Sequence, residues 1–217
     1  MRNATLTPHS DTPVTSGRLR GPAPLLDAAS PHVLLVDDEP GILQALVRTL
    51  RRGSADGLWP ALRTEIFTDP RAALARAEEQ SFALAISDFR MPGMNGAQLL
   101  TALRERQPEC RRVILSAHAD FDGLTEAINA ARISLFLAKP WNEPELLAAV
   151  HEQLAEHRRA VETLLLAERQ RLTQGEMSPQ EAERRRLERL EPGITQVQWS
   201  SDGAYVLDPT AAELAWP

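Results

Sequence analysis

Two strand-like runs of this chain each end in carboxylates that could bind a cation. Val33 to Val36 leads directly into Asp37 and Asp38, and Leu84 to Ser87 leads into Asp88. Continuous apolar runs are typical of strands buried in a parallel sheet, and such sheets bind ligands at the carboxyl ends of their strands. Carboxylates gathered there need a compensating cation, and a hard ion such as Mg²⁺ prefers oxygen ligands. The sequence therefore predicts an acidic site suited to metal binding and phosphate chemistry.

The composition of the 217-residue chain narrows the classes of protein to which it can belong. Its 43% hydrophobic and 25% charged residues are ordinary for a globular protein, and its net charge of -6 argues against one that mainly coats nucleic acid. The single cysteine, Cys110, excludes an intramolecular disulfide and is interpreted as an incidental thiol in a loop. No run approaches the roughly 18 apolar residues of a membrane span, and no signal-peptide core follows Arg2. We therefore expect a cytoplasmic protein without a membrane partner.

Alternating strand and helix patterns begin at Pro31 and occur five times. Residues 1–30 differ, because they are rich in Thr, Ser, Pro, Gly and Ala and predict a disordered leader. The expected strands are 33–36, 64–68, 82–87, 112–115 and 133–137, and the expected helices are 40–52, 69–80, 97–106, 120–131 and one starting near 142. Five such units predict an α/β fold, a doubly wound five-stranded parallel sheet with helices on both faces.

The last of these helices continues beyond the length that a five-stranded sheet can cover. Asn142 is its expected cap, and apolar residues keep a helical spacing to about Thr173, a length of roughly 45 Å. Ser178 and Pro179 then predict a second, short helix that ends near Leu190. The runs 194–199 and 204–207 flank an Asp-Gly turn and predict a closing β-hairpin. We thus expect a leader (1–30), a domain (31–152), a helical extension (153–175) and a tail (176–217).

Four short motifs lie at the ends of predicted strands. They are Val36-Asp37-Asp38-Glu39-Pro40, Ser87-Asp88-Phe89-Arg90-Met91-Pro92-Gly93-Met94-Asn95-Gly96, Val113-Ile114-Leu115-Ser116-Ala117 and Phe136-Leu137-Ala138-Lys139-Pro140-Trp141. In this order, over residues 32 to about 152, they resemble the response-regulator receiver domains of two-component signalling. The resemblance implies the flavodoxin-like fold of CheY-like proteins and a signalling switch that is not an enzyme. One departure is a long connection from Gly53 to Leu62, for which we expect a surface effect only.

The resemblance implies a role for each polar residue of these motifs. Asp88 would be the phosphoacceptor, and Lys139 would pair with the phosphoryl oxygens. Asp37, Asp38 and Asp88 would hold Mg²⁺ together with the backbone carbonyl of Arg90. Elementary chemistry supports these roles, because a carboxylate attacks phosphorus poorly until the charge on the phosphoryl oxygens is neutralised.

The resemblance also implies a switch that follows phosphorylation. Ser116 would hydrogen-bond the phosphoryl group, and Phe136 would change its rotamer in response. A new aspartyl phosphate adds charge and acceptors that recruit nearby hydroxyl and ammonium donors. Taken alone, Ser116 could equally be a capping hydroxyl and Phe136 a core residue, so both roles depend on the resemblance.

The roughly 65 residues after this domain contain no motif of a known output domain. We find no phosphate-binding Gly-Lys loop, no His-Asp metal motif and no helix-turn-helix pattern. The arginines at 184–186 alternate with glutamates, which favours a solvated, salt-bridged helix face, so no nucleic acid partner is expected. Lys139-Pro140-Trp141-Asn142 resembles receivers that precede phosphodiesterase-like or enhancer-binding outputs.

The long helix is the best candidate for an output. A weak coiled-coil pattern runs along it, with apolar residues at Leu147, Val150, Leu154, Val161 and Leu164. The pattern leaves dimerisation and packing against the chain's own tail equally open. Our leading hypothesis is a response regulator phosphorylated by a histidine kinase or phosphotransfer protein, which forms a homodimer through this helix or binds an unknown downstream protein. The alternatives are a constitutive scaffold with a receiver fold and a transcriptional regulator with an unrecognised DNA-binding tail.

Overall fold

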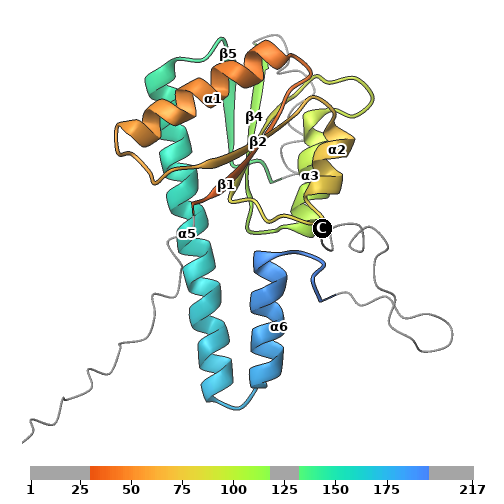
Figure 1. The fold of residues 1–217 in the computed structure, drawn as a ribbon, viewed down its shortest axis with the longest axis vertical. Coiled ribbons are helices and arrows are strands. Elements are labelled where there is room, and N and C mark those ends of the chain that lie inside the picture. Colours follow the sequence, from red (N-terminus) through yellow and green to blue (C-terminus); the bar gives the residue numbers. More distant parts are fainter. Residues whose placement is uncertain (1–29, 118–131, 196–217) are drawn as a thin grey trace, which may run out of the picture.

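Five parallel strands form one sheet at the centre of the protein (Figure 1). The structure is a computed structural model that describes residues 30–117 and 132–195. The strands are β1 (His32–Val36), β2 (Arg63–Phe67), β3 (Leu84–Asp88), β4 (Arg111–Ala117) and β5 (Leu135–Lys139). They lie in the order β2-β1-β3-β4-β5, and every neighbouring pair is parallel. The predicted doubly wound five-stranded parallel sheet is therefore confirmed.

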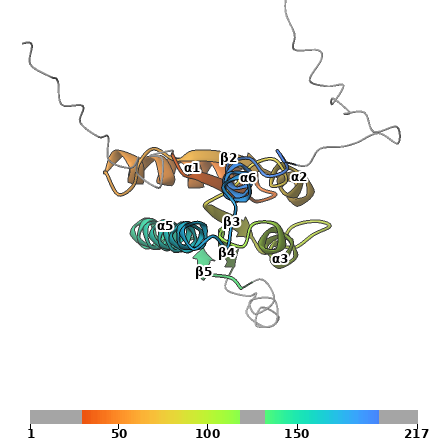
Figure 2. The same cartoon turned by 90° about the horizontal axis from the view of Figure 1, so that it is seen from below.

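Helices cover both faces of this sheet, as the view from below shows most clearly (Figure 2). On one face lie α1 (Pro40–Ala55) and the first part of α5 (Glu143–Thr173), and on the other lie α2 (Pro70–Arg76) and α3 (Gly96–Arg106). Because both faces are covered, the middle strand β3 buries all five of its residues.

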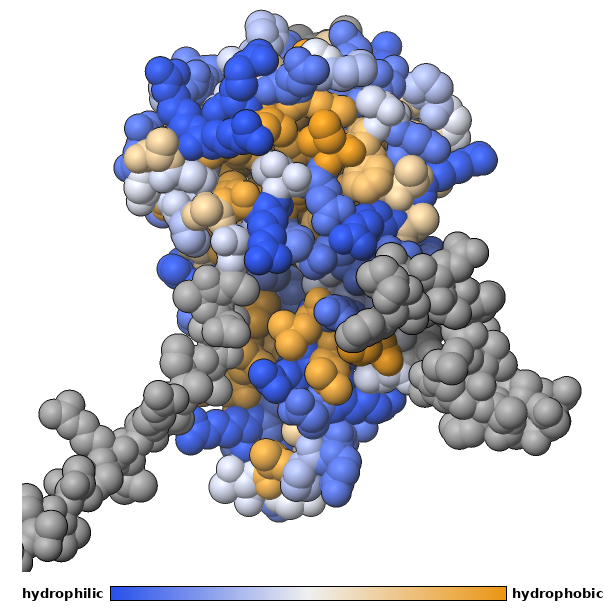
Figure 3. Space-filling view, in the orientation of Figure 1, coloured by the Kyte–Doolittle hydropathy of each residue, from blue (hydrophilic) through white to orange (hydrophobic). Residues whose placement is uncertain are grey.

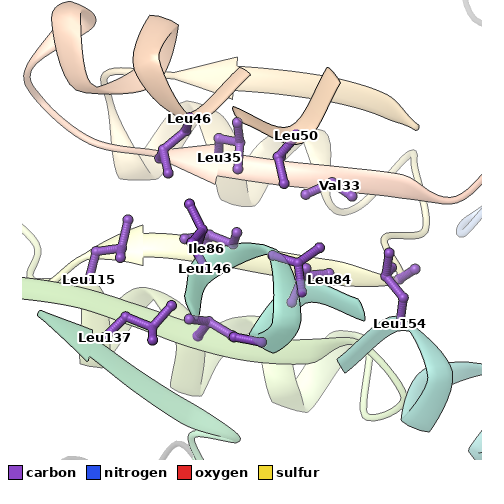
Figure 4. Packing of buried hydrophobic residues seen from close by; sticks show 14 of the residues in the cluster. Val33, Leu35, Leu46, Leu50, Leu84, Ile86, Leu115, Leu137, Leu146 and Leu154 are labelled. Atoms are coloured by element: carbon purple, nitrogen blue, oxygen red, sulfur yellow. The ribbon is translucent and has the colours of Figure 1, made fainter. Parts of the chain in front are cut away.

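Alternation along the strands divides the core into two hydrophobic clusters. In β1, Val33 and Leu35 face α1 and α5, whereas Leu34 and Val36 pack on the side of α2 and α3. Figure 4 shows the first cluster, in which α1 and α5 bring leucines onto the side chains of β1, β3, β4 and β5. This packing fixes the position of each strand end, where the expected site lies.

The connection between α2 and β3 departs most from the predicted boundaries. The helix ends at Arg76 although the pattern predicts an end near Gln80, and β3 begins at Leu84 although the prediction has Phe82. The buried side chain of Gln107 explains the difference. Its Oε1 accepts from the Phe82 N–H at 2.8 Å, and its Nε2 donates to the carbonyls of Ala77 and Gln80 at 2.7 Å each. These bonds hold the connection outside both the helix and the strand ladder.

The long connection between α1 and β2 contributes to the core, so the expectation of a surface effect only is wrong. Trp59, in this connection, is only 6% exposed and belongs to the first hydrophobic cluster. Its ring packs on Gly53, which lies within α1, and a Cβ at that glycine would approach a ring carbon to 2.2 Å. The glycine therefore makes room for the tryptophan.

Beyond the sheet, α5 continues and α6 (Pro179–Leu190) folds back beside it (Figure 1). We call residues 155–190 the helical hairpin. The predicted caps are confirmed, since Asn142 accepts from the N–H of Glu145, and Ser178 accepts from the N–H of Glu181. Figures 1 and 2 place α6 beneath the sheet, where it covers the part of α5 that the sheet does not reach. The structure thus contains the intramolecular packing that the sequence left open, whereas dimerisation stays a prediction.

Several predictions fall at or beyond the limits of the described residues. Ile194 and Thr195 lie in a turn, so the first strand of the predicted hairpin does not begin at Ile194. The rest of that hairpin, the leader up to residue 29 and the helix predicted over 120–131 lie outside the described residues, and the domain boundaries stay predictions. None of the helices in the described ranges combines the length and the hydrophobicity that a membrane span requires.

Candidate functional site

Three strands deliver charged side chains to one edge of the sheet. Asp37 follows β1, Asp88 ends β3, and Lys139 ends β5. The Lys139 Nζ donates to Asp37 Oδ2 at 2.6 Å and also to Asp88 Oδ1. Both carboxylates are buried, with Asp37 fully enclosed and Asp88 7% exposed. The ammonium therefore lies between the two carboxylates, at the sheet edge where the strand pattern predicts that carboxylates gather.

Backbone amides hold the other oxygen of each carboxylate. The N–H of Glu39 donates to Asp37 Oδ1 at 3.0 Å, and the N–H of Arg90 donates to Asp88 Oδ2 at 2.6 Å. In both cases the donor lies two residues after the aspartate, which is the spacing of an Asx turn. These contacts fix the orientation of both carboxylates. The sequence analysis did not predict these contacts. An aspartate at a strand end, followed by a backbone N–H two residues later, is the signal that could have indicated them.

The environment of the site keeps Lys139 charged. Burial alone lowers the pKa of Lys139, but its hydrogen bonds to Asp37 and Asp88 outweigh burial, and the net pKa is raised. Burial also raises the pKa of Asp88, and its hydrogen bond to Lys139 opposes that effect. The site thus combines a partly desolvated carboxylate with an ammonium that remains protonated near neutral pH.

The predicted switch residues lie on β4, which pairs with the end of β3, and on β5, one strand further along the sheet. Ser116 is almost fully buried, in the strand that pairs with β3, and its hydroxyl donates to the carbonyl of Ala117 at 3.5 Å. Phe136 is half-buried and packs against the second hydrophobic cluster, on the side of α3. The structure therefore places Ser116 on the strand beside Asp88 and Phe136 on the next strand, and their roles as switch residues remain predictions.

The central part of the sequence matches a known family. A sequence model described as the response regulator receiver domain matches residues 33–151, which is more than half of the chain. The chain belongs to the response regulator receiver domain family. The matched part of this receiver includes β1 to β5, both carboxylates and Lys139. Members of the family act in signalling and generally are not themselves enzymes.

Named relatives and solved structures agree with this assignment. The hydrogenase transcriptional regulatory protein HoxA from Cupriavidus necator is 34% identical over 120 residues, covering 55% of this chain and 23% of HoxA. The cyclic di-GMP phosphodiesterase response regulator RpfG from Xanthomonas campestris pv. campestris is 32% identical over 167 residues, covering 75% of this chain and 43% of RpfG. The chain thus matches less than half the length of either relative.

A solved structure supports the fold directly. The signal receiver domain of an HD domain-containing protein from Pseudomonas fluorescens Pf-5 is 29% identical and superposes with a TM-score of 0.55. The match covers 60% of this chain and 99% of that structure.

Receiver domains generally bind Mg²⁺ at the phosphorylation site, so the fit of this site to the ion matters. Asp37 and Asp88 supply only oxygen donors, the chemistry that Mg²⁺ prefers. Asp38, the third predicted ligand, is exposed, and within the described ranges no three His, Cys, Asp or Glu side chains already gather as a metal site. The donors present fit Mg²⁺ in kind, and the ligand set predicted from the sequence remains a prediction.

Proposed function

We propose that Asp88 accepts a phosphoryl group from a histidine kinase or a histidine phosphotransfer protein. The observation that carries the proposal is the buried Asp88 carboxylate held against the ammonium of Lys139 at the carboxyl edge of the sheet. Receiver domains in general take phosphoryl groups from histidine kinases, and membership of that family supports the same chemistry here.

The proposed reaction uses the groups already described. An Asp88 oxygen forms a bond to phosphorus while the bond from phosphorus to the donor's histidine nitrogen breaks. Lys139, which already donates to Asp88, pairs with the phosphoryl oxygens and offsets their charge. Mg²⁺, when held by Asp37, Asp38, Asp88 and the Arg90 carbonyl, would neutralise further charge on the same oxygens.

The proposed switch follows from the new acceptor oxygens. A phosphoryl group on Asp88 offers acceptors to the hydroxyl of Ser116, which donates to the Ala117 carbonyl over a long distance of 3.5 Å. Movement of Ser116 toward the phosphoryl group would leave space for Phe136 to turn inward. The change would then reach the surface formed by β5 and α5.

The proposed output is pairing of two copies through α5 or binding of a downstream protein. The helical hairpin exposes large apolar side chains, and Figure 3 shows hydrophobic atoms at its surface below the sheet. The exposed residues there are Leu166, Leu172, Leu187 and Leu190, and Ile194 is exposed in the turn after α6. Such side chains are suited to contact with another protein surface, and the region contains no sequence motif of an enzyme or of a DNA-binding element.

Incubation with Mg²⁺ and acetyl phosphate, followed by intact mass measurement, tests phosphorylation. We expect the wild-type chain to gain the mass of one phosphoryl group and Asp88→Asn to gain none. Asp56→Asn, which changes an exposed aspartate after α1, is the matched control and should be modified like the wild type. An unmodified wild type, or equal modification of Asp88→Asn, would contradict the proposal.

Light scattering coupled to size exclusion tests the output. We expect beryllofluoride, a mimic of the phosphoryl group, to increase the dimer fraction or the binding of a partner. A mass and a set of partners that do not respond to beryllofluoride would favour a constitutive scaffold.

A further inference from the structure

The first residue of α3 lies directly against the backbone of Asp88. A Cβ at Gly96 would lie 2.0 Å from the Asp88 carbonyl oxygen and 2.9 Å from the Ser87 Oγ. Real Cβ atoms essentially never approach other heavy atoms below 3.0 Å, so either a side chain at 96 or the end of β3 would have to move. The close approach therefore depends on the absence of a side chain at this position.

The same carbonyl is held from a second side. The buried hydroxyl of Ser87 donates to the Asp88 carbonyl oxygen at 2.8 Å. The Gly96 N–H donates to the carbonyl of Phe89, the next residue, at 2.9 Å. Ser87 in β3 thus holds the carbonyl of Asp88, and Gly96 in α3 holds the carbonyl of the following residue.

Helix α3 cannot easily give way, because its start is fixed by a capping box. Asn95 Oδ1 accepts from the N–H of Gln98 at 2.8 Å, and Gln98 Oε1 accepts from the N–H of Asn95 at 3.0 Å. Behind these residues the helix buries Leu99, Leu100 and Leu103 in the second hydrophobic cluster. Because the start of the helix is held in place, a methyl group at position 96 would press on the peptide of Asp88 at the end of β3.

We infer that Gly96, together with Ser87, is a positioning residue that sets where the Asp88 carboxylate lies relative to Lys139. The inference rests on the proposed phosphorylation of Asp88. Moving a Cβ from 2.0 Å to an allowed 3.0 Å requires a displacement of about 1 Å. A misplacement of that size at a reacting group lowers a rate by up to about 10²-fold.

A pair of glycine variants tests the inference, because the chain offers a matched control. Gly96→Ala adds the methyl group at the first residue of α3, whereas Gly41→Ala adds it in the first turn of α1, where no atom lies within 4 Å. Phosphorylation by acetyl phosphate with Mg²⁺ is followed over a range of acetyl phosphate concentrations. We expect Gly96→Ala to lower the saturating rate constant by roughly 10- to 100-fold with a smaller effect on the half-saturating concentration, and Gly41→Ala to stay within about twofold of the wild type.

A second variant keeps the test decisive if Gly96→Ala does not fold. Ser87→Ala removes one hydrogen bond without adding atoms, and we expect a roughly two- to tenfold slower saturating rate. Saturating rates equal to that of the wild type in every folded variant would overturn the inference. A lowered melting temperature of these variants would not rescue it, because loss of stability without loss of rate indicates a purely structural role. A wild type that is never phosphorylated would instead overturn the proposed function.

Discussion

The receiver part of this chain and its helical hairpin are held together by different forces. In the receiver, β3 buries all five residues between two hydrophobic clusters. In the hairpin, α6 buries none, and the buried residues of α5 all lie between Leu146 and Leu154, where the helix still covers the sheet. Beyond Leu154, an ion pair joins α5 to α6, that of Arg189 in α6 with Glu168 in α5 at 2.7 Å. The comparison teaches that the proposed switch lies in a densely buried body, whereas the proposed output surface is held by partly exposed contacts that are individually weak.

A polar junction connects the two regions. Arg111, the first residue of β4, donates to Gln153 Oε1 at 3.1 Å and to the carboxylate of Glu156 on α5. His157 of α5, one helical turn after Gln153, contacts the same end of the strand, because its Nδ1 lies 2.9 Å from the carbonyl of Glu109. Since β4 also includes Ser116, the strand that would sense phosphorylation is attached at its other end to the start of the hairpin.

The largest expected contrast concerns the single cysteine. Burial raises the pKa of the Cys110 thiol to about 12. We expect Cys110 to react with a thiol reagent near pH 8 on the order of a thousandfold more slowly than a free thiol, because so little of it is thiolate. Stopped-flow labelling of the native and the urea-unfolded chain measures the ratio. A native rate near the unfolded one would show that the receiver body is not rigid at this position.

Truncation of apolar side chains should separate the two regions by energy. Ile86→Ala leaves a cavity at a fully buried position in β3, and we expect the free energy of unfolding to fall by about 2–5 kcal/mol. Leu190→Ala in α6 removes a side chain that is 55% exposed, and we expect a change within about 0.5 kcal/mol. Urea denaturation of both variants measures the two values. Comparable losses would mean that the hairpin is packed as tightly as the receiver.

Removing the ion pair between α5 and α6 should have a smaller effect, confined to the hairpin. Glu168→Gln deprives Arg189 of its partner, and we expect α6 to lose up to about 1 kcal/mol of local stability. Hydrogen exchange of the α6 amides measures this, with Glu162→Gln at an exposed position of α5 as the control. Faster exchange throughout β3 in the same variant would show that the two regions unfold together.

The smallest expected effect is a pH dependence at the junction. Burial lowers the pKa of His157 below its ordinary 6.5, so the unfolded chain takes up this proton at a higher pH than the folded chain does. The stability from the neutral, buried ring is thus fully present above pH 6.5 and declines as the pH falls toward the lowered pKa. Between about pH 7.5 and about pH 5.5, we expect the free energy of unfolding to fall less in His157→Gln than in the wild type. Urea denaturation at both pH values measures the difference. His151→Gln, at an exposed site on the same helix, is the control, and equal effects of both variants would contradict the expectation.

Much of the fold was predictable because it depends on local patterns. Apolar runs identified the strands, and the caps at Asn142 and Ser178 identified the starts of α5 and α6. The predictions were wrong where a side chain from elsewhere in the chain makes the contact. Gln107 hydrogen-bonds the backbone between α2 and β3 and shifts the predicted boundaries there, and Trp59 packs on Gly53 although only a surface effect was expected. Local pattern cannot reveal a partner from elsewhere in the chain.

By itself the sequence determined that carboxylates end two strands and that an α/β receiver fold surrounds them. Only the tertiary structure decided that Lys139 lies between Asp37 and Asp88, which are 102 and 51 residues away along the chain. The same holds for Gly96, whose contact with the Asp88 carbonyl exists only once α3 packs on the sheet. The physical reason is that strand and helix signals come from neighbouring residues, whereas the site is formed by contacts that exist only after distant strands have paired.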